Sequence, residues 1–381
     1  MLIDPRALAV LKKLNKNNIE AYIVGGAVRD YLLNKRPQDY DICYNAEIKE
    51  LYKIFKGHKI YETGIKYGTI TLNYNGLLIE LTRFRTEKGY ADSRHPTKVS
   101  FVNEIKEDLL RRDFTINALA LNYKGEITDE FGGKGDLEKG IIKAVGNPKE
   151  RFTEDALRIL RAYRFAARFD FKIEEGTKRA IEEEKEGLKA LSKERVTAEI
   201  KEILKGKYFY KIFDEFLSAI SPIINTEKTE KERLSELLSA SSEKLKFPLF
   251  VAFLDCENSL RLSNNEQKTV DALKPFLTAK VVEIAPLFLD YNLEETALIF
   301  ELLELQNAIS PEQKAAYCRI IKKGLYKKSQ RLKIDGNDLM NLGFLGKEIT
   351  KIKTDLMLLI LQEKIKNKKS VLIKYVKENY K

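Results

Sequence analysis

The segment from Tyr22 to Ile42 decides the fold of this chain, and it reads Tyr22-Ile-Val-Gly25-Gly26-Ala-Val-Arg29-Asp-Tyr-Leu-Leu33, a short turn, and then Asp39-Tyr-Asp41-Ile42. A run of β-formers meets two glycines and gives way to apolar residues at helical spacing. A strand that enters a helix through glycines leaves backbone N–H groups free to face an anion. We therefore expect Gly26 to bind phosphate, with the guanidinium of Arg29 beside it.

A pair of carboxylates follows this turn. Asp39 and Asp41 are separated by one residue, and the segment Tyr40–Tyr44 reads as a strand. Residues i and i+2 of a strand point to the same face, about 6.5 Å apart. That separation suits two Mg²⁺ ions roughly 3.5–4 Å apart and bridged by carboxylates. A Gly-Gly turn or an Asp-x-Asp pair alone is usually structural, but their order here predicts nucleotidyl transfer, with Asp39 and Asp41 as catalytic, metal-binding residues.

The same segment resembles the signature of the class II tRNA nucleotidyltransferases, the CCA-adding enzymes and their poly(A) polymerase relatives. The matching residues are Gly25-Gly26-Ala27-Val28-Arg29-Asp30 and Asp39-Tyr40-Asp41. The resemblance implies an α+β fold, with an N-terminal polymerase-β-like nucleotidyltransferase head (a mixed or antiparallel sheet with helices) followed by an all-α neck, body and tail. We expect these parts at residues 1–146, 147–205, 206–330 and 331–381. The resemblance is specific over residues 20–205 and softer beyond.

The overall charge and composition agree with a protein that binds a polyanion. The net charge of +11 and the pI near 9.1 favour such a partner, most simply nucleic acid. Three widely spaced cysteines predict neither a disulfide framework nor a zinc site. No signal pattern opens the chain and no apolar run approaches the ~20 residues of a membrane span, so we expect a cytoplasmic protein. Two histidines are too few for a histidine-rich metal phosphohydrolase domain.

Periodicity outlines the rest of the head. It predicts helices over 6–18 and 48–55 and a hairpin over 68–84 with a type I′ turn at Asn75-Gly76. Alternation places Glu80 on the face opposite Ile79 and Leu81. Glu80 is therefore a candidate third catalytic carboxylate, with a solvated strand carboxylate as the alternative.

A polar segment without periodicity, Arg85–Pro96, follows the hairpin and predicts a loop. It resembles the flexible loop of CCA-adding enzymes, which that family links to addition of the final adenosine. The alternative is an ordinary surface loop.

A helix is predicted over Glu104–Asp113, and it ends in Arg111-Arg112-Asp113. These charges could form an exposed, ion-paired helix end. The resemblance implies instead that Arg112 binds phosphate and Asp113 the ribose hydroxyls, which suits the bidentate guanidinium and the accepting carboxylate. A hairpin over 118–131 and a glycine-rich segment, 132–137, close the head. The glycines resemble a hinge between head and neck, and could equally form a plain interdomain turn.

From Pro148 onward strand signals stop, and residues 154–168 predict one amphipathic helix with Thr153 as N-cap. Its apolar stripe consists of Ala156, Ile159, Leu160, Tyr163 and Ala167, and its charged face of Asp155, Arg158, Arg161 and Arg164. A solvated charged face is the alternative. The resemblance implies that Asp155 and Arg158 read the base, that Arg161 and Arg164 add charge around the nucleotide, and that the segment Ser192–Glu199 braces this helix.

The resemblance thus implies an enzyme that completes the CCA end of tRNA from CTP and ATP with Mg²⁺. The tRNA backbone would contact the basic closing helix, whose lysines are Lys364, Lys366, Lys368, Lys369, Lys374 and Lys377. We expect no membrane contact and no obligate protein partner. The alternatives are an A-adding enzyme with a separate CC-adding partner, a poly(A) polymerase, or a catalytically silent RNA-binding protein on the same scaffold. The basic helical tail disfavours a small-molecule nucleotidyltransferase.

Overall fold

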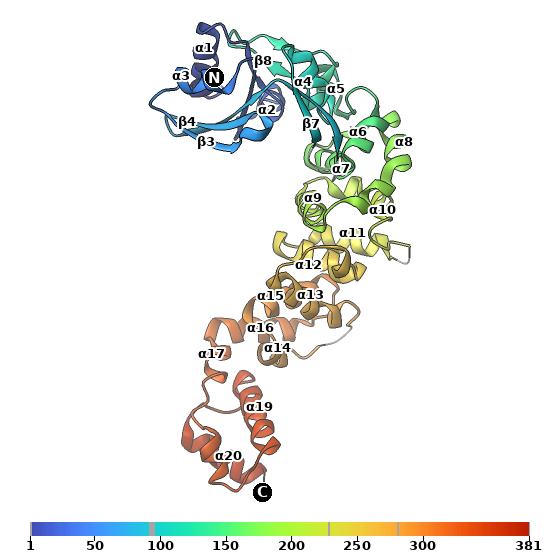
Figure 1. Cartoon of the computed structure of the whole chain (residues 1–381). Coiled ribbons are helices and arrows are strands. Elements are labelled where there is room, and N and C mark those ends of the chain that lie inside the picture. Colours follow the sequence, from blue (N-terminus) through green and yellow to red (C-terminus); the bar gives the residue numbers. More distant parts are fainter. Residues whose placement is uncertain (1, 91–95, 228, 280–281, 381) are drawn as a thin grey trace. The chain divides into compact units, whose positions relative to one another are not determined.

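The computed structural model describes residues 2–90, 96–227, 229–279 and 282–380, and the chain forms two compact units (Figure 1). The first unit comprises Met1–Lys228 with Asn258–Arg261, and the second Thr229–Glu257 with Leu262–Lys381. Within the described ranges no helix combines the length and apolar character needed to cross a membrane. The finer division into head, neck, body and tail stays a prediction.

A seven-stranded sheet forms the centre of the head, in the order β3-β4-β5-β2-β1-β8-β9. β2 and β5 are parallel and the other neighbours antiparallel, so the predicted mixed sheet is confirmed. The sequence did not predict β3. In chain order the strands are β1 (Ala21–Val24), β2 (Tyr40–Tyr44), β3 (Lys59–Gly64), β4 (Thr69–Tyr74), β5 (Leu77–Arg83), β8 (Ala120–Leu121) and β9 (Ile127–Thr128).

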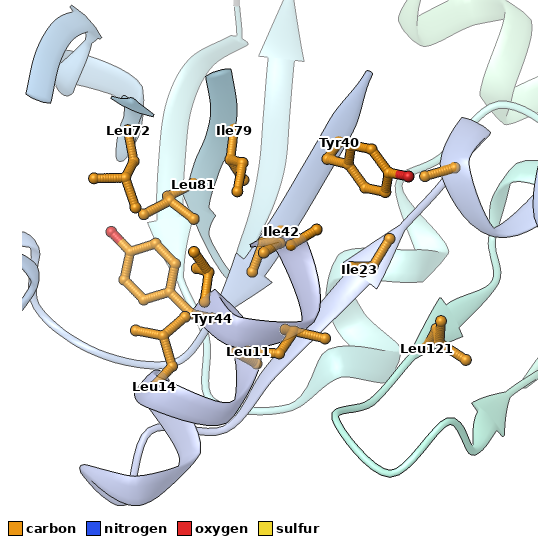
Figure 2. Close-up of a cluster of buried hydrophobic side chains, with 14 of the residues drawn as sticks. Leu11, Leu14, Ile23, Tyr40, Ile42, Tyr44, Leu72, Ile79, Leu81 and Leu121 are labelled. Carbon is orange, nitrogen blue, oxygen red and sulfur yellow. The ribbon is translucent and has the colours of Figure 1, made fainter. Parts of the chain in front are cut away.

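The two faces of this sheet have different roles. On one face Ile42 and Tyr44 of β2 lie in a buried cluster with Leu11 and Leu14 of α1 (Pro5–Lys16), as Figure 2 shows. Helix α3 (Ile48–Ile54) adds to the same cluster. Each fully buried apolar side chain of this kind contributes about 1.5–3 kcal/mol. Because side chains alternate along a strand, Asp41 lies on the opposite face, where the site is built.

The hairpin of β4 and β5 has the predicted turn. Asn75 and Gly76 both have positive φ, 52° and 83°, as a type I′ turn requires. In β5 the side chains of Ile79 and Leu81 are buried and that of Glu80 is exposed, which confirms the predicted alternation.

The polar segment after this hairpin is not an irregular loop. β6 (Arg85–Tyr90) pairs antiparallel with β7 (Pro96–Phe101), so the prediction of a loop was wrong for these residues. Residues 91–95 lie outside the described residues. A two-stranded ribbon is held by backbone hydrogen bonds, and its side chains need not alternate between core and solvent. The sequence pattern therefore gave no strand signal.

The predicted helix over 154–168 is two helices, α6 (Pro148–Glu154) and α7 (Leu157–Phe169). The chain is extended at Asp155, with φ −148° and ψ 100°, and the Asp155 carboxylate accepts a hydrogen bond from the Leu157 amide at 3.0 Å. This cap satisfies a free donor at the start of α7. Thr153 lies inside α6, so the predicted N-cap was wrong. The predicted apolar stripe is confirmed, because all five of its side chains are buried.

The remaining elements of the first unit are mostly helical. The predicted glycine hinge contains a helix, α5 (Gly133–Lys139), and a two-residue strand, β11 (Lys172–Ile173), departs from the all-helical expectation by pairing with β10 (Ile141–Ile142). The helices are α2 (Gly26–Leu32), α4 (Ile105–Leu110), α8 (Glu175–Glu184), α9 (Lys193–Lys205) and α10 (Phe213–Ile220).

The second unit is helical throughout its described ranges (Figure 1). A buried cluster near its C-terminus includes Leu356, Leu372 and Val376. Its α-helices are α11 (Lys231–Ala240), α12 (Glu243–Leu254), α13 (Asn264–Leu273), α14 (Ile284–Asp290), α15 (Leu293–Leu305), α16 (Pro311–Lys323), α17 (Leu325–Ser329), α18 (Gly336–Met340), α19 (Lys347–Leu361) and α20 (Lys369–Asn379).

Candidate active site

Three carboxylates lie at or beside the face of the sheet opposite α1. Asp41 is the second residue of β2, and the parallel register places it directly beside Glu80 of β5. Asp39 precedes β2 and is exposed, as Asp41 and Glu80 are. Although Asp41 is accessible to solvent, nearby protein atoms partly desolvate it. This desolvation raises its pKa, and the like charges of Glu80 and Asp39 raise the pKa further.

This donor set fits a divalent cation. Oxygen ligands suit hard cations, and carboxylates whose mutual repulsion raises a pKa gain from a positive ion between them. Across the residues that the structure describes, no three histidine, cysteine or acidic side chains are grouped closely enough to hold a metal by themselves. Asp39 and Asp41 would therefore supply only part of a coordination shell, as carboxylates do in sites that also bind substrate phosphate.

The glycine turn lies beside an arginine. Gly25 has φ 69° and precedes α2, and Gly26 is the first residue of that helix. A Cβ atom at Gly25 would lie 2.9 Å from Nη1 of Arg112. A side chain at Gly25 would be strained by the positive φ and would require the guanidinium of Arg112 to shift. The predicted phosphate turn and the predicted phosphate arginine are thus brought together.

The guanidinium of Arg112 is hydrogen-bonded to neighbouring side chains. Its Nη2 donates to Oδ2 of Asp108 at 3.2 Å and to Sγ of Cys43 at 3.4 Å, while its buried Nε has no hydrogen-bond partner among the described residues. Burial works against its charge, but the carboxylate of Asp108 outweighs burial, so the pKa of Arg112 is raised. Arg112 stays cationic at any pH at which the protein works.

Arg29 is buried rather than open to solvent. Its guanidinium donates to Asp30 at 2.8 and 3.0 Å and to Oδ1 of Asn117 at 2.7 Å. It also lies over the ring of Phe169, 4.8 Å from the centroid. The predicted contact of Arg29 with phosphate is untested. In the structure the side chain of Arg29 instead links α2 to Asn117 and to Phe169 at the end of α7.

Asp113 and Arg161 form a bidentate pair. Arg161 donates through Nε and Nη2 to Oδ2 of Asp113 at 2.8 and 2.6 Å, and Oδ1 accepts from Asn117 and from the Phe114 amide. Burial opposes ionisation of Asp113, but Arg161 and the hydrogen bonds outweigh it and lower its pKa to about 2. Two predicted nucleotide residues, from the head and from α7, thus lie together.

The two predicted base-reading residues flank the start of α7. Oδ2 of Asp155 accepts from Arg195 of α9 at 2.8 Å. Arg158 donates to Glu154 at 2.8 Å and to the backbone carbonyl of Arg111 at 2.8 Å. Because Asp155 lies before α7, it does not share a helical face with Arg158 as the sequence predicted. The two residues remain neighbours, since the Arg158 amide donates to the Asp155 carbonyl at 3.0 Å.

Helix α9 braces α7 along its length. Besides the Arg195–Asp155 contact, Arg164 lies 2.8 Å from Glu199 in an ion pair. Burial lowers the pKa of Arg164 and raises that of Glu199, so desolvation weighs against both charges. The bracing role expected of the segment Ser192–Glu199 agrees with these contacts. Arg164 faces α9, and its predicted place near the nucleotide is untested.

Two residues that hold the site were missed from the sequence. Asp108 is fully buried and binds both Arg111 and Arg112, and Asn117 links Arg29 to Asp113. The sequence did indicate the role of Asp108, because it precedes Arg111 and Arg112 by three and four residues, the spacing at which helical side chains meet. No sequence pattern indicated the role of Asn117, since Arg29 is distant from it in the sequence.

Comparisons with known proteins agree with this geometry. Residues 21–143 match the family model of the "Poly A polymerase head domain", and residues 170–218 match that of the "Probable RNA and SrmB- binding site of polymerase A". The first range covers the sheet, the carboxylates and the arginine segment. The second covers the helices that follow α7.

The chain is 44% identical over 253 residues to the CCA-adding enzyme of Lactobacillus delbrueckii subsp. bulgaricus, a match that covers 65% of this chain and 63% of that relative. Its structure resembles that of the Bacillus stearothermophilus CCA-adding enzyme in complex with CTP, with a TM-score of 0.77, 26% identity, and coverage of 99% and 97% of the two chains. The Thermotoga maritima CCA-adding enzyme complexed with tRNA-CCA has the same fold, with a TM-score of 0.69, 23% identity, and coverage of 98% and 95%. Two parts of the chain thus match models of poly(A) polymerase domains, and its sequence is similar to those of CCA-adding enzymes over a stretch that spans less than two thirds of those relatives' length.

Proposed function

We propose that this protein adds CCA to the 3′ end of tRNA without a template, using CTP and ATP and releasing pyrophosphate. The observation that carries the proposal is the meeting, on one face of the sheet, of Asp39 and Asp41 with Arg112 and the Gly25-Gly26 turn. The relatives support it: they are named CCA-adding enzymes, and the solved structures contain CTP or tRNA-CCA.

The carboxylates are assigned to the metal. Asp39 and Asp41 would hold Mg²⁺, which when bound supplies activation of the primer 3′-hydroxyl and neutralises charge on the α-phosphate and the leaving pyrophosphate. Asp41 must be ionised for this role, and a bound cation would favour the ionised form against the burial and like charges that raise its pKa. Glu80 beside it is a further candidate ligand or a like charge that tunes Asp41.

The triphosphate is assigned to the glycine turn and the arginine. The start of α2 at Gly26 and the guanidinium of Arg112 lie on either side of Gly25 and would bind the phosphates together. Arg29 would support the same group by fixing α2, and Asp113, with Arg161, would meet the ribose. Arg164 would contribute indirectly, by pairing with Glu199 of α9 and so holding α7 in place.

Recognition of the nucleotide base is assigned to Asp155 and Arg158. A carboxylate only accepts hydrogen bonds and a guanidinium only donates them. Cytosine and adenine both present an exocyclic amino donor beside a ring-nitrogen acceptor, whereas guanine and uracil present the reverse. Sites built on such contacts reject mismatched groups by up to ~10⁴–10⁵. Asp155 retains accepting capacity beside Arg195, so the pair can select CTP and ATP.

In the test, the protein is incubated with tRNA that lacks its CCA end and with each labelled nucleotide in turn. We expect incorporation of two C residues and then one A, and no use of UTP or GTP. Use of ATP alone on tRNA that already ends in CC would instead indicate an A-adding enzyme, and unlimited addition of A a poly(A) polymerase. No incorporation with tight tRNA binding would indicate an RNA-binding protein. The cytoplasm, the site expected for this reaction, suits a protein with three free cysteines.

A further inference from the structure

Asp108 is a buried carboxylate outside the residues assigned above. It lies on α4 with no exposed surface, although it is charged. Oδ1 accepts from Nε and Nη2 of Arg111 at 3.0 and 2.8 Å, and Oδ2 accepts from Arg112 at 3.2 Å. Buried charges of this kind persist only when they are paired and hydrogen-bonded.

The contacts of Asp108 extend toward the strand that carries Asp41 and toward the glycine turn. Oδ2 also accepts from the thiol of Cys43 at 3.4 Å, and Cys43 is two residues from Asp41 on the same face of β2. Through Arg112 the carboxylate reaches Gly25, since Nη1 of the same guanidinium would lie 2.9 Å from a Cβ atom there. The strand that carries Asp41 and the arginine beside the glycine turn thus both contact one buried carboxylate.

A third contact joins the β6–β7 ribbon. The Arg85 amide, at the first residue of β6, donates to Oδ1 of Asp108 at 3.4 Å. The Arg85 side chain continues to the Tyr67 carbonyl at 2.5 Å and to Thr69 of β4 at 3.3 Å. The base of the ribbon is therefore fixed to the same carboxylate that fixes Arg112.

We propose that Asp108 is a positioning residue that holds Arg112 against the Gly25-Gly26 turn, so that the triphosphate meets a guanidinium already in place. This inference rests on the proposed function. Arg111 binds the other oxygen and so fixes the rotation of the carboxylate, which aims Oδ2 at Arg112. A preorganised guanidinium spends little free energy on reorientation when the substrate binds.

The test compares Asp108→Asn with Asp4→Asn. Asp4 is also a buried carboxylate paired with an arginine, Arg6, but its Tyr40 contact places it on the other side of the sheet. We expect Asp108→Asn to weaken CTP binding, measured by calorimetry with Mg²⁺, by about 10- to 100-fold, the loss typical of a charged hydrogen bond. Inhibition by pyrophosphate should weaken in parallel, and Asp4→Asn should change neither.

Two further readouts separate positioning from a general structural defect. The preference for CTP over UTP should stay at the wild-type value, because the base-reading residues are untouched. In an Arg112→Ala background, Asp108→Asn should cost nothing further, since its effect passes through Arg112. Equal losses for Asp4→Asn, altered base preference, or additive effects with Arg112→Ala would overturn the proposal.

The fold is monitored by circular dichroism. If Asp108→Asn does not fold, Asp108→Glu keeps the charge and displaces the carboxylate by one methylene, and the same loss of CTP and pyrophosphate affinity is expected. Wild-type affinity in that variant would contradict positioning. The proposed function fails separately, if the wild-type protein binds CTP but adds no nucleotide to tRNA; the calorimetric comparison still decides the role of Asp108. Absence of CTP binding by the wild type overturns both.

Discussion

Asp41 on β2 lies directly beside Glu80 on β5, in the parallel strand pair of the seven-stranded sheet. The register brings a carboxylate from each strand to one face, and the mutual repulsion contributes to the raised pKa of Asp41. A cation bound there would relieve that repulsion.

The first prediction follows from this pair. Asp41→Asn should reduce nucleotide addition to roughly background, because the metal loses a charged ligand, while tRNA binding in a filter assay stays near wild type. The matched change Glu80→Gln distinguishes two roles. If Glu80 is only a like-charge neighbour, its removal lowers the pKa of Asp41 and shifts the acid limb of the activity profile to lower pH. A loss as large as that of Asp41→Asn would make Glu80 a ligand, and substantial activity in Asp41→Asn would contradict the metal assignment.

The second prediction concerns the Asp113–Arg161 pair and pH. The folded pKa of Asp113 is about 2, below its ordinary 3.8, so its contribution to stability is fully present above about pH 4 and is lost as pH falls toward 2. The shift corresponds to about 2 kcal/mol. Urea unfolding should show Asp113→Asn less stable than wild type at pH 6, with a gap that narrows below about pH 4. Asp170→Asn, which removes an exposed pair with Lys211, should cost less. If the difference in unfolding free energy between the two proteins stays constant down to pH 3, the Asp113–Arg161 pair does not lower the pKa of Asp113.

The third prediction concerns base choice. Asp155→Ala removes the acceptor and should let UTP or GTP compete, whereas Arg158→Ala should reduce use of both CTP and ATP. Arg195→Ala should resemble a weaker Asp155→Ala, because Arg195 orients that carboxylate at 2.8 Å. Single-nucleotide incorporation with all four substrates measures this. Wild-type rejection of UTP and GTP by Asp155→Ala would move base selection to other residues.

The fourth prediction concerns the β6–β7 ribbon, in which Tyr90 pairs with Pro96. Replacing residues 91–95 by an Asn-Gly turn keeps the paired strands. Addition of C should continue and addition of the terminal A should fail, as the resemblance to the flexible loop implies. The assay uses tRNA ending before CCA and tRNA ending in CC. A parallel fall of both additions would assign the segment to stability instead.

The fifth prediction concerns the lysines near the C-terminus. Deleting residues 364–381 would also remove Leu372 and Val376 from a buried cluster, so point changes are cleaner. Lys366 and Lys368 are exposed, and their joint replacement by Ala should weaken tRNA binding and reduce its salt slope by about 0.9 for each duplex phosphate that the protein no longer neutralises. Lys369→Ala is the control, because Lys369 pairs with Asp338 at 2.6 Å. An unchanged slope in the double variant would mean that these lysines bind no phosphate.

Much of the head was predictable because its signals are local. The Gly25-Gly26 turn, the type I′ turn at Asn75-Gly76 and the alternation around Glu80 follow from residue types and short spacings. The α+β class was confirmed for the same reason, since alternation and helical spacing occupy different parts of the chain.

What the sequence could not predict depends on partners distant along the chain. The break at Asp155 is stabilised by a cap within the next two residues and by Arg195 of α9, and helical periodicity on either side concealed it. The pairing of Arg161 with Asp113 and of Arg29 with Asn117 requires the fold to be known. Charge patterning identified these arginines as functional candidates but not what each one contacts.

Gly25 and Arg112 occupy one shared volume, because a side chain at the first would displace the guanidinium of the second. A substitution at Gly25 therefore bears on Arg112 as well, whereas a smaller residue in place of Arg112 would not disturb Gly25. A lineage that gains a methyl group at Gly25 must move or shorten the side chain of Arg112, the residue to which we assign the triphosphate. We therefore expect lineages that replace Gly25 to carry a compensating change at Arg112.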